Sequence, residues 1–253
     1  LPKSFGSAIL LKLAGQKNIS GFATQYRNFL LDKPVKLTED LKKKHQVYLH
    51  LALAYSNGGA ILEKPKLSLT LDTTIEQAVK KKWLGGLTNP KYLLINPGAA
   101  FGPAKRWKPE YFADVITQVC SKTNASVIII GSAKEFEIAE NIRFFIKDKQ
   151  LQILNLAGAT TLDELIVLIN NSHCFLTNDS GPMHIAAALN VKQVALFAST
   201  NPITTGPFSD KAQVISSGIA CAPCIKRTCK FGTYECFNLI KTEKVVEKIL
   251  EIW

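Results

Sequence analysis

Two segments of this chain carry residues suited to binding a phosphorylated ligand. The first, Asn96-Pro-Gly-Ala-Ala-Phe-Gly-Pro-Ala-Lys-Arg-Trp107, follows an apolar run and precedes a helical pattern. Such a loop offers backbone N–H groups and a helix N-terminus to phosphate, and its lysine, Lys105, adds a cation. The second, Thr177-Asn-Asp-Ser-Gly-Pro-Met-His184, repeats the arrangement. Two loops of this kind predict a diphosphate ligand of the nucleotide type.

Individual side chains in and near these loops suggest separate roles. Lys105 could neutralise charge on a departing phosphate. Asp179-Ser-Gly181 is expected to begin a helix whose free N–H groups bind phosphate, although a plain helix cap is the alternative. His184 could contact phosphate or a donor sugar, or be a partly buried structural histidine. Glu135 could accept hydrogen bonds from ribose hydroxyls, or simply favour the helix dipole.

The elements that must position these residues alternate regularly from residue 91 onward. Strands are predicted at 92–95, 127–130, 153–156, 174–176, 194–197 and 214–216, and helices near 109–122, 134–147, 161–171, 181–189 and 242–252. Apolar strands alternating with amphipathic helices predict an α/β fold with a doubly wound parallel sheet. Thr161 and Glu164 have the spacing of a capping box. Ligands of such sheets lie at the carboxyl ends of the strands, so the loops at 96–106, 131–135, 157–160 and 178–181 should converge on one crevice.

The first part of the chain is less regular. We predict a helix over 7–13 that stops at Gly15, and one amphipathic helix over 39–55 that Asn57-Gly-Gly59 ends. Residues 60–90 are interpreted as a linker containing a short strand, Leu67–Leu71, and a helix around 75–83. Leu87-Thr-Asn-Pro90 then marks a boundary between a domain of residues 1–90 and a domain of residues 91–253.

Charge and composition limit the class of partner. Residues 1–95 contain 15 Lys/Arg and 6 Asp/Glu, whereas residues 96–253 contain 16 and 14. This basic first part favours an anionic partner or, alternatively, is a solvated surface. No apolar stretch approaches the roughly 20 residues of a membrane-spanning helix. No RRM, KH or helix-turn-helix signature is present, so we expect no nucleic-acid partner. The absence of G-x-G-x-x-G and Walker A patterns disfavours dinucleotide enzymes and P-loop NTPases.

The two loops, together with Leu1-Pro-Lys-Ser-Phe-Gly-Ser-Ala-Ile9, resemble glycosyltransferase family 9, the ADP-heptose:lipopolysaccharide heptosyltransferases. The resemblance implies a GT-B fold of two Rossmann-like domains, with the N-terminal one incomplete in this chain. It implies inverting transfer of L-glycero-D-manno-heptose from ADP-heptose to the first heptose of the lipopolysaccharide inner core, a lipid A–Kdo–heptose acceptor. Other core transferases of the family, or an ADP-sugar-binding protein without turnover, remain alternatives. The implied location is cytoplasmic, at the anionic inner face of the inner membrane.

The resemblance also implies roles for particular residues. Lys105 would contact the donor diphosphate, while Gly98, Ala99 and Ala100 line the loop. Glu135 would hold the ribose, and Leu156–Thr160, ending at Thr160, would line the adenine pocket. Asp179, Ser180 and Gly181 would bind diphosphate and heptose, with His184 beside them. No cofactor or catalytic metal is expected.

The resemblance assigns no residue of this sequence as the general base. The family's base is an Asp in a Gly-Asp turn after the first strand, and this sequence shows no such segment. Asp32 and Asp40 lie in different contexts. Because the chain begins at Leu1-Pro2, we expect either that an N-terminal portion carrying the base is missing from this sequence, or that the protein is a truncated homologue without it.

Six cysteines fall into two groups. Cys120 and Cys174 lie in apolar patterns and are expected to be buried. Cys221, Cys224, Cys229 and Cys236 lie within sixteen residues of a basic loop. Four thiols could hold a structural zinc, but only one Cys-x2-Cys pair is present. Zinc, disulfides and free thiols therefore all remain open.

Overall fold

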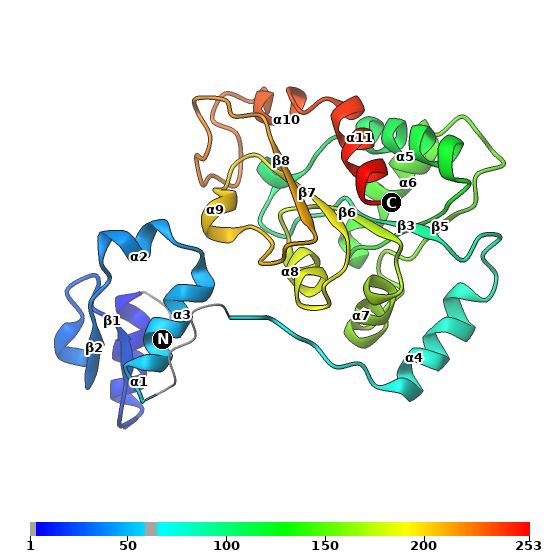
Figure 1. Ribbon diagram of the computed structural model, residues 1–253. Helices are drawn as coiled ribbons and strands as arrows, with labels where there is room; N and C mark the ends of the chain where they lie inside the picture. Colours follow the sequence, from blue (N-terminus) through cyan, green and yellow to red (C-terminus); the bar gives the residue numbers. More distant parts are fainter. Residues whose placement is uncertain (1–3, 59–64) are drawn as a thin grey trace. The chain divides into compact units, whose positions relative to one another are not determined.

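A computed structural model describes residues 4–58 and 65–253 of the chain. These residues form two compact units (Figure 1): the first comprises the chain up to Lys66 together with Ile203–Thr205, and the second comprises Leu67–Pro202 and Gly206–Trp253. Leu1–Lys3, which begin one of the family-like segments, and Gly59 lie outside the described residues.

The second unit is built on a six-stranded sheet in which every neighbouring pair of strands is parallel. Its strand order is β5-β4-β3-β6-β7-β8. The strands are β3 Tyr92–Asn96, β4 Ser126–Ile129, β5 Ile153–Asn155, β6 Cys174–Asn178, β7 Gln193–Phe197 and β8 Ala212–Ser216. All six predicted strands are therefore confirmed. β3, β4, β6 and β7 are buried along their whole length, as expected for a parallel sheet covered on both faces.

Helices cover both faces of this sheet (Figure 1). Contacts group α5, α6 and α11 on one face, where they share a large apolar core with the sheet, and α4, α7 and α8 around a second core. The helices of the second unit are α4 Thr73–Val79, α5 Pro109–Thr123, α6 Phe136–Phe145, α7 Leu162–Asn170, α8 Gly181–Ala188, α10 Glu235–Asn238 and α11 Thr242–Ile252. A short helix, α9 Pro202–Thr205, has its residues 203–205 grouped with the first unit. Short 3-10 turns, η3 Pro103–Lys105 and η4 Ala133–Glu135, precede α5 and α6. The five helices predicted after residue 91 are confirmed, and α9 and α10 are additional.

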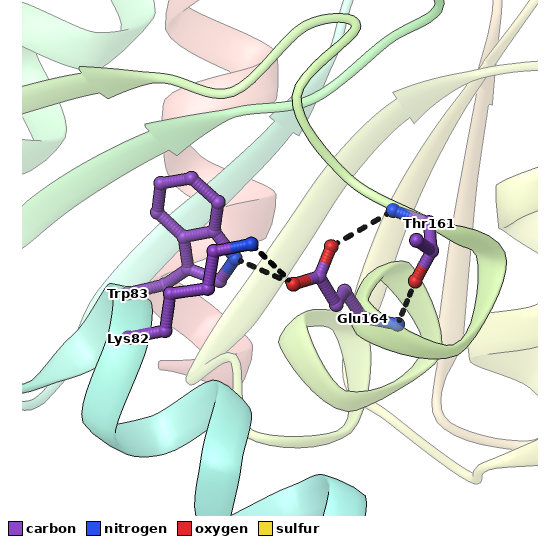
Figure 2. A network of polar contacts seen from close by, with 4 residues as sticks. All are labelled: Lys82, Trp83, Thr161 and Glu164. Carbon is purple, nitrogen blue, oxygen red and sulfur yellow. Dashed lines mark hydrogen bonds and ion pairs between the residues drawn. The ribbon is translucent and has the colours of Figure 1, made fainter.

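The segment that precedes β3 packs with the second unit. A π-helical turn, η2 Lys80–Leu84, follows α4, and the side chains of Lys82 and Trp83 both donate to Glu164 Oε1, at 2.7 and 3.3 Å (Figure 2). Glu164 Oε2 accepts from the Thr161 backbone N–H, so the predicted capping box is confirmed. Because these contacts attach α4 and η2 to α7, the compact units divide after Lys66, whereas the sequence analysis placed the boundary at residue 90.

The first unit contains a two-stranded parallel pair. Its elements are α1 Phe5–Leu13, β1 Ser20–Phe22, η1 Asn28–Leu30, β2 Lys33–Val35, α2 Glu39–Lys43 and α3 Gln46–Tyr55. Arg27 is buried and ties the unit together, because its Nε donates to Phe22 O at 3.1 Å and its Nη1 to Ser4 O at 2.8 Å. α1 ends as predicted, with Gly15 at φ +72° just beyond it.

Two predictions in the first 90 residues are wrong. The helix expected over 39–55 is two helices, since Lys44 is extended and the His45 side chain caps α3 by accepting from Val47 N–H. A local cap thus competes successfully with helix continuation. The strand expected at Leu67–Leu71 does not form. Leu67 and Leu69 are exposed and the segment pairs with no strand of the described chain, so its apolar spacing lacks the neighbour a strand needs.

Candidate functional site

The sheet reverses its winding direction between β3 and β6. From β3 the chain continues to β4 and β5 on one side, and from β6 it continues to β7 and β8 on the other. β3 and β6 are neighbours, and the last residue of β3, Asn96, pairs in register with Thr177. The two loops singled out from the sequence therefore leave the carboxyl ends of adjacent strands at a topological switch point, where ligands of open α/β sheets bind.

Two asparagines join the two loops. Asn96 Nδ2 donates to Ser180 Oγ at 2.6 Å, and Asn178 Nδ2 donates to the Pro97 carbonyl at 2.7 Å. Asn178 Oδ1 also accepts from the Trp107 backbone N–H at 3.4 Å. Both asparagines are buried, so these bonds fix the spacing between the loops. The sequence analysis missed them, although a polar residue ending each of two apolar strands was the available signal.

Lys105 lies against the second loop. Its Nζ pairs with Asp179 Oδ2 at 2.5 Å, and the side chains are only 14% and 6% exposed. The same carboxylate oxygen accepts a hydrogen bond from Thr200 Oγ1, on the loop that follows β7. The Lys105 ammonium also lies 4.8 Å from the centroid of the Phe101 ring. The structure thus brings together Lys105 and Asp179, and adds Thr200, which the sequence analysis did not identify.

A cavity of about 320 Å³ opens beside this ion pair, at the ends of β3, β4 and β6. Seven of the ten predicted donor-site residues line it: Gly98, Ala99, Ala100, Glu135, Thr160, Ser180 and Gly181. Lys105, Asp179 and His184 lie outside this lining. Asp179 precedes Ser180 in the chain and pairs with Lys105, whereas His184 is exposed on the first turn of α8. The N-terminus of α8 borders the cavity at Gly181. Pro182 has no N–H and the Met183 N–H donates to Ser180 O at 3.2 Å, so the Gly181 N–H and the positive end of the helix dipole are what suit an anion.

Glu135 is held rigidly at the cavity wall. Its Oε2 accepts from the Ser132 backbone N–H at 2.7 Å and from Ser132 Oγ at 2.9 Å, which closes a capping box at η4. The backbone of Gly98 approaches this carboxylate so closely that a Cβ at position 98 would lie 2.0 Å from Oε1. A side chain at position 98 would therefore have to displace the Glu135 carboxylate from its bonds to Ser132. In its present position the carboxylate could accept hydrogen bonds from a diol.

The segment predicted to line an adenine pocket borders an open groove. Ala157, Gly158 and Ala159 face Ala133, Lys134 and Phe136 across it. Gly158 has φ +79°, and a Cβ there would lie 2.7 Å from Ala133 Cα, so this loop can approach η4 only because residue 158 is glycine. A planar base could lie in this groove with its ribose toward Glu135.

The cysteine segment, residues 221–236, contacts two loops: the one that carries Lys105, residues 96–106, called the lysine loop below, and the one that follows β7. The Ala104 N–H donates to Arg227 O at 3.0 Å, and the Ile225 N–H donates to Ser199 O at 2.7 Å. The four thiols form no disulfide, and no group of three or more His, Cys, Asp or Glu side chains in residues 4–58 and 65–253 is placed to hold a metal ion. Backbone N–H groups of Tyr234 and Phe231 lower the pKa of Cys229, whereas burial raises the pKa of Cys236. Cys120 and Cys174 are buried, as predicted.

Neither Asp32 nor Asp40 is placed as a general base. Asp32 Oδ1 pairs with Lys12 at 2.8 Å and its Oδ2 accepts from the Ile19 N–H. These bonds, first that from Lys12, lower the pKa of Asp32. Asp40 pairs with Lys44 across one turn. Both carboxylates are thus engaged by lysines within the first unit.

Comparison with known proteins identifies the family. Residues 1–235 match the sequence profile of glycosyltransferase family 9 (heptosyltransferase). The chain belongs to this family. A lipooligosaccharide heptosyltransferase 2 of Campylobacter jejuni is 37% identical over 169 residues, which cover 66% of this chain and 53% of that protein. Lipopolysaccharide heptosyltransferase 2 of Escherichia coli K12 is 34% identical over 221 residues, covering 85% of this chain and 63% of that protein.

A solved structure supports the same assignment. The structure of E. coli ADP-heptose lipopolysaccharide heptosyltransferase II superposes with a TM-score of 0.79 at 30% identity, covering 99% of this chain and 74% of that one. The predicted α/β fold of the GT-B type with Rossmann-like domains is thereby confirmed. This family 9 chain spans roughly half to two thirds of the length of the curated relatives it matches. Within the described part of the chain, no helix is long and apolar enough to cross a membrane. The roles given to individual site residues stay predictions.

Proposed function

We propose that this chain binds ADP-heptose in the crevice at the carboxyl ends of β3 and β6, and that it acts as the donor-binding part of a heptosyltransferase of type II. The reaction is inverting transfer of L-glycero-D-manno-heptose to the first heptose of the lipopolysaccharide inner core. The observation that carries the proposal is the convergence of Lys105, Ser180, Gly181 and Glu135 at one switch point in a family 9 chain. The names of the curated relatives support the choice of heptose as the transferred sugar.

The site geometry supports a separate set of residues for each part of the donor. The Gly181 helix N-terminus and Lys105 suit the two phosphates, since N–H dipoles and a cation both favour negative charge. Glu135 suits the ribose diol, and the groove at Gly158 suits the adenine. Lys105 would stabilise the negative charge that forms on departing ADP. We assign no general base among the described residues, because Asp32 and Asp40 are engaged elsewhere.

The proposed acceptor is a lipid A–Kdo–heptose glycolipid, reached from the cytoplasmic face of the inner membrane. The net charge of +9 over residues 1–95 (15 Lys/Arg against 6 Asp/Glu) supports attraction to this anionic surface. The donor requires no further cofactor in this proposal.

Calorimetric titration with ADP-heptose, ADP and UDP tests the donor site. We expect the adenine ligands to bind and Lys105→Ala to weaken ADP binding by about 1.5–3 kcal/mol, the value of a hydrogen bond to a charged group. Lys122→Ala, an exposed lysine on α5, is the matched control. Because Lys105→Ala leaves the buried Asp179 without its cation, with the Thr200 hydroxyl still bonded to Oδ2, the double variant Lys105→Ala/Asp179→Ala tests whether the uncompensated carboxylate causes the loss of binding. ADP binding should stay weak in the double variant. If ADP affinity instead returned to that of the parent protein, Lys105 would not belong to the donor site.

Turnover on heptosyl-Kdo2-lipid A tests the reaction. Binding with turnover supports the full proposal. Turnover only on Kdo2-lipid A would instead indicate heptosyltransferase I. Donor binding without turnover would support the donor site and fit either a general base outside the described residues or an ADP-sugar-binding protein. An absence of ADP binding would refute the donor site itself.

A further inference from the structure

Asp179 holds the Lys105 ammonium through an oxygen that also accepts a second hydrogen bond. Thr200 Oγ1 donates to the same Oδ2 that pairs with Lys105. Asp179 is 5% exposed, so its carboxylate is almost fully removed from solvent. A buried ion pair is favourable only when its geometry is good and further hydrogen bonds satisfy its oxygens. Thr200 supplies such a bond to the oxygen that pairs with Lys105.

Thr200 is itself held by the cysteine segment. The carbonyl of the preceding residue, Ser199, accepts from the Ile225 N–H at 2.7 Å. Two residues further along, the Arg227 carbonyl accepts from the Ala104 N–H, adjacent to Lys105. One segment therefore fixes both the loop that carries Lys105 and the loop that carries Thr200.

We propose that Thr200 is a positioning residue that fixes Lys105, acting through Asp179, for contact with the donor diphosphate. Its hydroxyl holds the Asp179 carboxylate turned toward the lysine, and the Ile225–Ser199 bond keeps the hydroxyl in place. The diphosphate part of this inference rests on the proposed function. The control of Lys105 by Thr200 does not, because both contacts form without a ligand.

Chemical labelling of lysines tests the inference without a ligand. Lysines of the folded protein are acetylated with a low dose of acetic anhydride, and the extent at Lys105 is measured by mass spectrometry relative to Lys122. Thr200→Val removes the hydroxyl at nearly constant volume, so we expect Lys105 labelling to rise by roughly tenfold, the effect of losing a hydrogen bond to a charged group. Thr200→Ser keeps the hydroxyl and should behave as the parent protein.

Thr117→Val is the matched control, since Thr117 also loses a hydroxyl that donates to a protein oxygen, Ala113 O at 2.8 Å, on a helix away from the loops. It should leave Lys105 labelling unchanged. Unchanged labelling in Thr200→Val, or equal increases in Thr200→Val and Thr200→Ser, would overturn the positioning role.

Ligand titrations then separate this inference from the proposed function. In Thr200→Val we expect ADP to bind roughly three- to tenfold more weakly, with AMP affinity unchanged, because Lys105 is assigned to the diphosphate. Equal losses for ADP and AMP would contradict the diphosphate part. If the parent protein binds no ADP, the proposed function fails, while the labelling result still decides whether Thr200 controls Lys105.

Discussion

Gly98→Ala probes the contact between the lysine loop and Glu135. The new Cβ would lie 2.0 Å from Oε1, 2.2 Å from Cδ and 2.6 Å from Oε2 of Glu135. Carbon and oxygen atoms that do not bond need more than 3.0 Å, so the carboxylate has to move by roughly 1 Å. It cannot do so and keep its two hydrogen bonds from Ser132, at 2.7 and 2.9 Å. The substitution therefore displaces Glu135 from the cavity wall.

The expected cost follows from the bonds that are lost. A helix cap contributes about 0.5–2 kcal/mol, and a hydrogen bond to a charged group about 1.5–3 kcal/mol. Since the displaced carboxylate regains water, we expect a loss of unfolding free energy of about 2 kcal/mol, equivalent to a Tm decrease of roughly 4–8 °C for a domain of this size. ADP affinity should fall by about tenfold or more if Glu135 holds the ribose.

Urea denaturation of four proteins measures the effect: the parent, Gly98→Ala, Glu135→Ala and the double variant. Glu135→Ala removes every atom that the new Cβ would meet most closely, so Gly98→Ala should cost under about 0.5 kcal/mol in that background. Gly86→Ala, where a Cβ would meet nothing within 4 Å, is the control for the glycine-to-alanine change itself. The reasoning is refuted if Gly98→Ala costs the same in both backgrounds, or leaves the stability of the parent unchanged.

Two further predictions concern the framework of the second unit. Tyr92 is fully buried, its hydroxyl donates to Leu168 O at 2.6 Å, and burial raises its pKa. Tyr92→Phe should therefore lower the free energy of unfolding in urea by about 1–3 kcal/mol. Tyr26→Phe is the control and should have no effect, because Tyr26 is 94% exposed. The bonds from Lys82 and the Thr161 N–H lower the pKa of Glu164 in the folded protein. The stability that the ionised Glu164 contributes is therefore complete above its unfolded pKa of about 4.3, and it is lost as pH falls through the lower folded pKa. The stability difference between the parent and Glu164→Gln should accordingly shrink from pH 7 toward pH 3, and a difference independent of pH would contradict this assignment.

The architecture of the second unit was predictable because its signals are local and repeated. Apolar runs of four or five residues, each followed by a helical pattern, can be buried only in a covered parallel sheet. The carboxyl ends of such strands meet at one edge, and for that reason the sequence predicts that Gly98, Glu135, Thr160 and Ser180 share one cavity.

The errors arose where the sequence signal depends on a partner. Leu67–Leu71 has the spacing of a strand, but a strand needs a neighbour, and the fold provides none within the described residues. The break between α2 and α3 depends on one histidine accepting one backbone hydrogen bond. The attachment of α4 to α7 depends on Glu164, which lies 82 residues from Lys82 in the chain.

The sequence alone determined the family, the covered parallel sheet and the identity of the loops that end its strands, because periodicity and loop composition are properties of neighbouring residues. Only the tertiary structure decided how those loops hold one another. Asn96 bonding Ser180, Thr200 bonding Asp179 and Arg227 bonding Ala104 join residues 21 to 123 positions apart. Hydrogen bonds of this range depend on the path of the whole chain, and no local pattern encodes them.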